Sequence, residues 1–154
     1  MGLIGGSVAA ALRVNGWRVT GSDGNPEREQ QALSKGLLDA VGVDADAELS
    51  FVATPVSHVA VGVRHMLAST AGVVTDVGSV KAPIVSAISD PRFIGGHPMA
   101  GSELQGLDGA DADMFRGAVW VLTPTATTSD VTFELVAEVV RQLGGDVLAI
   151  PAER

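Results

Sequence analysis

The sequence predicts a doubly wound α/β fold, in which helices cover both faces of a mostly parallel sheet. The main observation is that short apolar segments rich in β-branched residues alternate with helical segments, a pattern typical of successive β/α units. A chain of 154 residues with 46% hydrophobic side chains is also large enough for one domain with a substantial core. Finally, the 19 glycines are a high number, which indicates many tight turns and close backbone approaches.

In the first half of the chain, glycines and prolines separate the predicted elements. Gly16 is placed to end the first helix, and a short strand of β-forming residues follows it. Pro26 suits the first turn of a second, polar helix, which Gly36 ends. Next come a brief strand, then a buried strand that Pro55 ends, and then a helix with Ser57 as its candidate N-cap. The expected bounds are 5–15, 26–36 and 57–69 for the helices, and 17–23, 37–41 and 49–55 for the strands.

The second half continues the alternation. Its clearest element is a long amphipathic helix that has Asp130 near its start and two glycines after its end. One long irregular stretch, roughly 96–117, is where loops would carry function. The expected bounds are 80–89 and 129–145 for the helices, and 73–78, 92–98, 118–124 and 146–150 for the strands.

Charge and composition exclude several classes of protein. The net charge of −8, without a basic cluster, disfavours a nucleic-acid partner, because phosphate neutralisation needs the opposite sign. The chain has no cysteine, which excludes disulfides, thiolate metal sites and a cysteine nucleophile. No apolar run is long enough for a membrane span, and the start lacks the features of a signal peptide. We therefore expect a soluble cytoplasmic protein.

The opening MGLIGGS is typical of a dinucleotide-binding turn, the G-x-G-x-x-G fingerprint of Rossmann-type sheets, with Gly2 and Gly5 as its second and third glycines. The first strand of such a sheet is missing, and we expect its central position, in a 3-2-1-4-5-6 order, to be flanked by strands 17–22 and 50–54. Asp23 stands 18 residues after Gly5, where the fingerprint places an acid. Its carboxylate would bind the adenosine ribose and repel a 2′-phosphate, which favours NAD over NADP. The alternative is a glycine-rich helix start with a turn aspartate.

Two further motifs follow predicted strands. In TDVGSVK, Ser79 lies just after a strand end, where doubly wound sheets bind ligands, and Lys81 lies one turn into the next helix. The alternatives are an N-cap serine and a surface lysine. In IGGHPMAGSE, His97 lies beyond a strand, can take a proton near neutral pH, and has glycines around it that permit close approach to a ligand. A structural histidine is the alternative. His58 and His65 are interpreted as surface or satisfied residues, and no residues have convincing metal spacing.

The motifs GLIGGS, GSDGNPE, ATPV, TDVGSVK and GGHPMAGSE occur in an order that resembles prephenate dehydrogenase, over essentially the whole chain. The resemblance implies an NAD-dependent oxidoreductase of tyrosine biosynthesis, which converts prephenate to 4-hydroxyphenylpyruvate by oxidative decarboxylation. Loss of CO2 aromatises the ring, and this makes the hydride step effectively irreversible.

The same resemblance implies roles for individual residues. His97 would contact the ring hydroxyl of prephenate and accept its proton as hydride leaves for the nicotinamide, and Ser79 would share that hydroxyl and orient the histidine. The implied substrate-binding residues are Gly101, Ser102 and Glu103, the last of them an acid that guards the pocket. The implied cofactor-binding residues are Gly2, Leu3, Ile4, Gly5, Asp23, Thr54 and Pro55.

The resemblance also implies a domain layout. Residues 1–150 would form the dinucleotide-binding domain, and residues 151–154 would begin an all-helical C-terminal domain that is absent from this sequence. In the family that domain dimerises and supplies an arginine to the substrate carboxylates, so we expect the complete enzyme to be a homodimer. Two alternatives remain. One is a dehydrogenase of arogenate or a related cyclohexadienyl substrate, and the other is a non-catalytic nucleotide-binding fragment.

Overall fold

The computed structural model describes residues 1–100 and 106–151. Its helices are α1 (Leu3–Val14), α2 (Pro26–Ser34), α3 (Val59–Ser69), α4 (Ala82–Ala87) and α5 (Asp130–Gln142), with short 3-10 helices η1 (Val56–His58) and η2 (Leu107–Gly109). Its strands are β1 (Thr20–Gly21), β2 (Ala40–Val41), β3 (Leu49–Val52), β4 (Val73–Asp76), β5 (Phe93–Pro98), β6 (Val119–Thr123) and β7 (Asp146–Ala149). The predicted alternation of strands and helices is confirmed. Within the described ranges, no helix combines the length and apolar character needed to cross a membrane.

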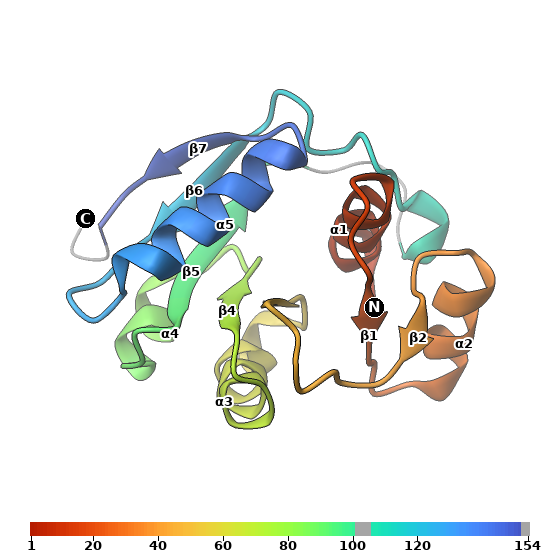
Figure 1. The fold of residues 1–154 in the computed structure, drawn as a ribbon, viewed down its shortest axis with the longest axis horizontal. Helices are drawn as coiled ribbons and strands as arrows, with labels where there is room; N and C mark the ends of the chain where they lie inside the picture. The colour runs from red at the N-terminus through yellow and green to blue at the C-terminus, as the bar shows by residue number, and fades with distance from the viewer. Residues whose placement is uncertain (101–105, 152–154) are drawn as a thin grey trace.

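Five strands form one sheet in the order β3-β4-β5-β6-β7, and β1 pairs with β2 in a separate sheet (Figure 1). Strands β3, β4 and β5 are parallel, β6 runs antiparallel to β5, and β7 is parallel to β6. The prediction of a doubly wound, mostly parallel sheet is confirmed, with the reversal at β6 as its exception. Between β5 and β6 the described residues contain only the short η2 helix, and an antiparallel return needs no crossover helix.

Helices cover both faces of the larger sheet. One buried cluster joins α1 and α5 to the sheet and includes Val136, while a second joins α3 and α4 to the opposite face and includes Val63 and Ile84. Neighbouring Val73 and Val74 of β4 belong to different clusters, as alternate side chains of a strand do. A third cluster packs α1 and α2 against Val19, Leu37 and Leu38, which precede β1 and β2, and against Leu107 of η2. Because α1 contributes to the first and third clusters, it connects the two sheets.

The strands predicted at 17–22 and 50–54 contain β1 and β3, which belong to separate sheets and are not paired with each other. In Figure 1, β1 and β2 stand apart from β4, and α1 lies directly above β1. The pairing of β1 with β2 extends only over Thr20 and Gly21, so the strand is shorter than the 17–23 expected. Helix α1 contributes to the buried cluster that Leu49 and Phe51 of β3 pack against, and also to the cluster that contains Val19, the residue before β1.

The predicted helix ends are partly correct. Gly16 and Gly36 follow α1 and α2 with φ of +85° and +75°, as expected for glycines that end helices. The prediction that Ser57 caps the third helix is wrong. Ser57 lies inside η1, its hydroxyl is 3.1 Å from Nδ1 of His58, and α3 begins only at Val59. The tighter 3-10 turn at this point delays the start of the α-helix.

Candidate active site

A buried carboxylate closes the carboxyl end of β4. Asp76 is the last residue of that strand, and its side chain is completely buried. Its Oδ1 accepts a hydrogen bond from the backbone N–H of Gly96 in β5 (3.1 Å), and its Oδ2 accepts one from Gly78 N–H (2.9 Å). Since an unpartnered buried charge is costly, these bonds are what allow a carboxylate at this position.

Lys81 is the charged partner of Asp76. Its Nζ donates to Oδ2 of Asp76, and the lysine side chain is only 14% exposed. The expectation that Lys81 lies one turn into a helix is wrong, because it occupies the N-cap position of α4, and Pro83 fits the first turn that follows. The alternative of a surface lysine is also wrong. Burial lowers the pKa of Lys81 from its ordinary value, and the Asp76 carboxylate opposes that effect.

His97 lies inside β5, not beyond a strand end as expected. The strand pairs with β4 through Phe93 and Ile94 and then continues past it along β6, where His97 is opposite Val121. His97 therefore projects from the edge where β4 has already ended, beside the Asp76–Lys81 pair. Its side chain is half-buried.

The surroundings of His97 favour its neutral form. Burial lowers the pKa of His97 below its ordinary value of 6.5, the nearby Lys81 ammonium lowers it further, and the Asp76 carboxylate raises it. A neutral imidazole has a free ring nitrogen that can accept a proton near neutral pH. This is the protonation state that a general base needs.

The two glycines before His97 are required by packing within the chain. A Cβ at Gly95 would lie 2.8 Å from Cγ1 of Val85 and 3.3 Å from Cδ of Lys81. A Cβ at Gly96 would lie 2.7 Å from the carbonyl oxygen of Asp76 and 3.2 Å from Nε1 of the buried Trp120. The expectation that these glycines make room for a ligand is therefore wrong, because protein atoms already fill the space beside them.

Trp120 of β6 packs beside the end of β5. Its indole is completely buried and contacts Phe51 edge-on, with ring centroids 6.1 Å apart, and Phe115 at 5.0 Å. Within the described part of the chain, its Nε1 is a buried polar atom without a hydrogen-bond partner. The aromatic cluster packs against the end of β5 and the start of β6, on the face of the sheet opposite α4.

The start of α1 has the features of an anion-binding turn. Gly2 is its N-cap and provides no capping side chain, and the first turn has no acidic residue. The first N–H groups of a helix lack partners within it and carry the positive end of its dipole. A Cβ at Gly5 would lie 3.1 Å from Cβ of Ala53, so this glycine brings the helix close to the residue after β3. A Cβ at Gly2 would meet nothing within 4 Å. These features fit the phosphates of a dinucleotide.

Asp23 lies beside this turn, as the fingerprint predicts. Its carboxylate forms an ion pair with the amino group of Met1, the residue before Gly2, and accepts a hydrogen bond from Asn25 N–H at 2.8 Å. The Asp23 N–H in turn donates to the Glu29 side chain at 3.0 Å. The structure thus brings together the two parts of the predicted adenosine and phosphate site.

The remaining predicted residues have different positions. Thr54 and Pro55 are exposed directly after β3, and Ser79 is exposed in the loop after β4, at the same end of the sheet as His97. Gly101, Ser102 and Glu103 lie outside the described residues. The structure therefore places Thr54, Pro55 and Ser79 at one end of the sheet. It does not test the substrate-binding roles of Gly101, Ser102 and Glu103.

Sequence reasoning did not select Asp76, and it misinterpreted Lys81. The available signal was an acid at the end of the apolar run VVTDV, because a carboxylate in a buried strand requires a partner. A lysine five residues later, across a glycine turn, is a suitable one.

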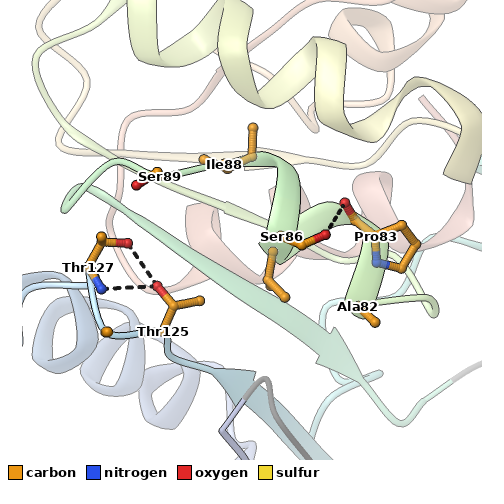
Figure 2. A pocket seen from close by; sticks show the side chains of 9 residues that line it. Ala82, Pro83, Ser86, Ile88, Ser89, Thr125 and Thr127 are labelled. Carbon is orange, nitrogen blue, oxygen red and sulfur yellow. Dashed lines mark hydrogen bonds between the residues drawn. The ribbon is translucent and has the colours of Figure 1, made fainter.

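A separate pocket lies away from these residues, between α4 and the loop after β6. It has a volume of about 650 Å³. Figure 2 shows that its hydroxyls bond locally: Ser86 donates to the Pro83 carbonyl at 3.2 Å, and the hydroxyls of Thr125 and Thr127 are 2.9 Å apart. None of the predicted site residues lines it. In the described ranges, no group of three or more His, Asp or Glu residues is arranged to hold a metal ion.

Comparisons with known proteins show which family has this sequence and fold. Residues 8–149 match the family described as prephenate dehydrogenase, nucleotide-binding domain. The prephenate dehydrogenase of Bacillus subtilis is 33% identical over 161 residues, which cover 92% of this chain and 42% of that protein. The arogenate dehydrogenase of Synechocystis has 32% identity and a TM-score of 0.88, covering 98% of this chain and 57% of that one.

The prephenate dehydrogenase of Aquifex aeolicus, in complex with hydroxyphenyl propionate and NAD+, has 30% identity and a TM-score of 0.91, covering 99% of this chain and 58% of that one. The chain thus spans about half the length of the relatives it matches. The chain belongs to the family of prephenate dehydrogenase nucleotide-binding domains.

Proposed function

We propose that the chain is the dinucleotide-binding part of an NAD-dependent dehydrogenase that oxidatively decarboxylates prephenate to 4-hydroxyphenylpyruvate. The observation that carries the proposal is His97, a half-buried histidine beside the Asp76–Lys81 pair at the carboxyl end of β4. The Aquifex aeolicus relative supports it, since that protein is known in complex with hydroxyphenyl propionate and NAD+.

In this proposal, His97 acts as the general base. It accepts the proton of the ring hydroxyl, while the carbon that bears this hydroxyl gives up a hydride. Departure of CO2 then leaves the electron pair that makes the ring aromatic. When bound, the nicotinamide supplies the hydride acceptor. Ser79, exposed in the loop after β4, is proposed to share the substrate hydroxyl and orient His97.

The cofactor is proposed to bind across the start of α1. Backbone N–H groups of Gly2, Leu3, Ile4 and Gly5 face the pyrophosphate in this proposal, because the helix start has no capping side chain or acidic residue of its own. Asp23 accepts hydrogen bonds from the adenosine ribose, and Thr54 and Pro55 border the dinucleotide. A carboxylate at this position favours NAD over NADP by repulsion of a 2′-phosphate.

Substrate selection is proposed to involve Gly101, Ser102 and Glu103, together with a C-terminal helical domain that dimerises and provides a carboxylate-binding arginine. For this reason, we expect the 154 residues alone to turn over little prephenate. Arogenate or another cyclohexadienyl compound is the alternative substrate, and the similarity to the Synechocystis arogenate dehydrogenase favours keeping it in the test.

The proposal is tested in two steps. Calorimetric titration of the chain with NAD+ and NADP+ should give tighter binding of NAD+. Turnover of the full-length protein, with prephenate and arogenate compared as substrates, should give reduced cofactor and CO2 in equal amounts. A preference for NADP+ of about tenfold, equal to about 1.4 kcal/mol, would contradict the proposed cofactor. Reduced cofactor formed without CO2 would contradict the proposed reaction.

A further inference from the structure

The ion pair beside His97 has an arrangement that stability alone does not explain. Asp76 is fully buried and Lys81 nearly so, yet an apolar pair of similar volume often stabilises a fold equally well or better. Both charged groups contact the residues directly before His97. Asp76 binds the N–H of Gly96, and the alkyl chain of Lys81 passes over Gly95.

We propose that Asp76 and Lys81 form a single buried unit that positions His97 for its role as a base. The role of His97 rests on the function proposed above, whereas the arrangement of the unit rests on contacts within this chain.

The Asp76 carboxylate holds the backbone of β5 just before His97. From Gly95 onward, β5 has left β4 and is paired with β6 alone among the described strands. The Asp76 carboxylate provides an additional bond to this segment, because its Oδ1 accepts from Gly96 N–H at 3.1 Å. Its Oδ2 is held by Gly78 N–H and by Lys81, so the carboxylate itself has a fixed orientation. The residue before His97 is thereby tied to the end of β4.

Lys81 places a positive charge near the imidazole ring of His97. Gly95 and His97 are two residues apart in one strand, so their side-chain positions lie on the same face of the sheet. The Cδ of Lys81 would be 3.3 Å from a Cβ at Gly95, which places the lysine on the His97 side of β5. Among the described residues, the charged groups that act on His97 are Lys81 and Asp76, and His97's partner on β6 is the apolar Val121. The ammonium therefore disfavours a second positive charge on the imidazole.

The two charges of the pair act on His97 in opposite directions. Burial is the main cause of the lowered pKa of His97, the Lys81 ammonium lowers this pKa further, and the Asp76 carboxylate raises it. Asp76 nevertheless has to be present, because burial lowers the pKa of Lys81 and only the carboxylate opposes this. Asp76 thus keeps the lysine charged and in place, and the lysine keeps His97 available to accept a proton.

The chain offers a direct test, because it has only three histidines. A proton NMR titration of the imidazole signals of the 154-residue chain follows all three, His97→Asn assigns the signal of interest, and His58 and His65 provide references in the same spectrum. Lys81→Met removes the charge but keeps a long unbranched side chain, and it should shift the midpoint of the His97 titration to higher pH. Asp76→Asn should shift it downward while Lys81 stays charged, and Lys81→Arg should keep it near the wild-type value.

A buried Asp76 without its partner could unfold the Lys81→Met variant, so the double variant Asp76→Asn/Lys81→Met is included. This neutral pair removes both charges, so its His97 titration midpoint should lie between the raised midpoint of Lys81→Met and the lowered midpoint of Asp76→Asn. A folded Lys81→Met variant with the wild-type midpoint, or a double variant whose midpoint equals that of Asp76→Asn, would overturn the proposal.

Turnover of the full-length protein separates this inference from the proposed function. If both hold, the low-pH limb of kcat/KM moves to higher pH in Lys81→Met, a change that loss of packing alone would not cause. Shifted midpoints in a protein that does not oxidise prephenate or arogenate would refute the proposed function and leave the positioning unit intact. If the protein is active, but Lys81→Met changes neither the low-pH limb of kcat/KM nor the His97 titration midpoint, then only the positioning unit is refuted.

Discussion

The two ends of the proposed site are built in different ways. At the start of α1, the groups open to a ligand are backbone N–H groups, and a Cβ at Gly2 would meet no atom within 4 Å. The Asp23 carboxylate beside them is paired with the Met1 amino group. At the end of β4, Asp76 and Lys81 are buried, and Cβ atoms at Gly95 and Gly96 would collide with protein atoms.

The difference follows from what each end has to do. A dinucleotide is held by many weak contacts to backbone and ribose, so its site can be open and made from a local turn. Proton transfer needs one imidazole in one place with one charge state, which a packed cluster provides. Substitutions at the open end should therefore change binding, whereas those at the packed end should change chemistry or stability.

The largest effect is expected for His97→Asn in the full-length protein. Asparagine keeps a polar contact but cannot accept the proton, so kcat should fall by about 10²–10⁴. Affinity for NAD+ should hardly change, because the start of α1 and Asp23 are left intact. Steady-state kinetics with a separate NAD+ titration measure both, and Ser79→Ala provides the comparison for a residue that only orients the base.

The opposite result would remove the distinction between the two ends. If His97→Asn kept kcat within about threefold, well short of a general base's contribution, while its affinity for NAD+ collapsed, then His97 would belong to the cofactor site.

Asp23→Ser is expected to have the next largest effect, this time on binding. Loss of charge-assisted hydrogen bonds to the ribose should weaken NAD+ by about one to two orders of magnitude, and NADP+ should lose much less because its 2′-phosphate is no longer repelled. Calorimetry of the chain with both cofactors gives the ratio. Asp23→Asn is the matched control, since it keeps the size and removes the charge. Equal weakening of both cofactors would show that Asp23 only supports the turn.

Local and long-range features differed in how well the sequence predicted them. The start of α1, the turn glycines Gly16 and Gly36 and the position of Asp23 were predictable, because each depends on a few adjacent residues or on a fixed spacing. The alternation of strands and helices was predictable for the same reason. The reversal of β6 was not, since strand direction is decided by pairing with β5 and not by the sequence of β6 itself.

At the packed end, the environments of single residues also could not be predicted from local sequence. Lys81 was interpreted from its expected place in a helix, but its environment is decided by Asp76, five residues earlier, and by the absence of a side chain at Gly95. Gly95 and Gly96 were interpreted as room for a ligand, whereas the structure uses them for Lys81 and the Asp76 carbonyl. Contacts of this kind require the register of β4 and β5, which no local pattern contains.

A pair of glycine substitutions compares the two ends by stability. Gly96→Ala places a Cβ 2.7 Å from the Asp76 carbonyl oxygen, and backbone cannot move aside easily, so the free energy of unfolding should fall by about 1–3 kcal/mol. The midpoint of thermal unfolding should then drop by about 3–10 °C. Gly2→Ala is the matched control, because its φ of −105° suits alanine and its Cβ would meet nothing within 4 Å. Equal losses in both variants would mean that the α1 turn is as tightly packed as β5.

The smallest expected effect is a dependence of stability on pH that comes from His97. Its pKa in the folded chain is below the ordinary value of 6.5, chiefly because of burial and then because of Lys81. An unfolded chain, with an ordinary histidine pKa near 6.5, therefore takes up this proton at a higher pH than the folded chain does. As pH falls through about 6.5, the unfolded state gains a proton that the folded state lacks, and the free energy of unfolding decreases. Above that range both states are neutral at this residue and the contribution of His97 is constant.

Urea denaturation of wild type and His97→Asn between about pH 7.5 and 5.5 measures this contribution, which the variant lacks. The free energy of unfolding should decline more steeply with falling pH in the wild type. Parallel curves would show that His97 has the same proton affinity in both states, and the packed end would then not control its charge.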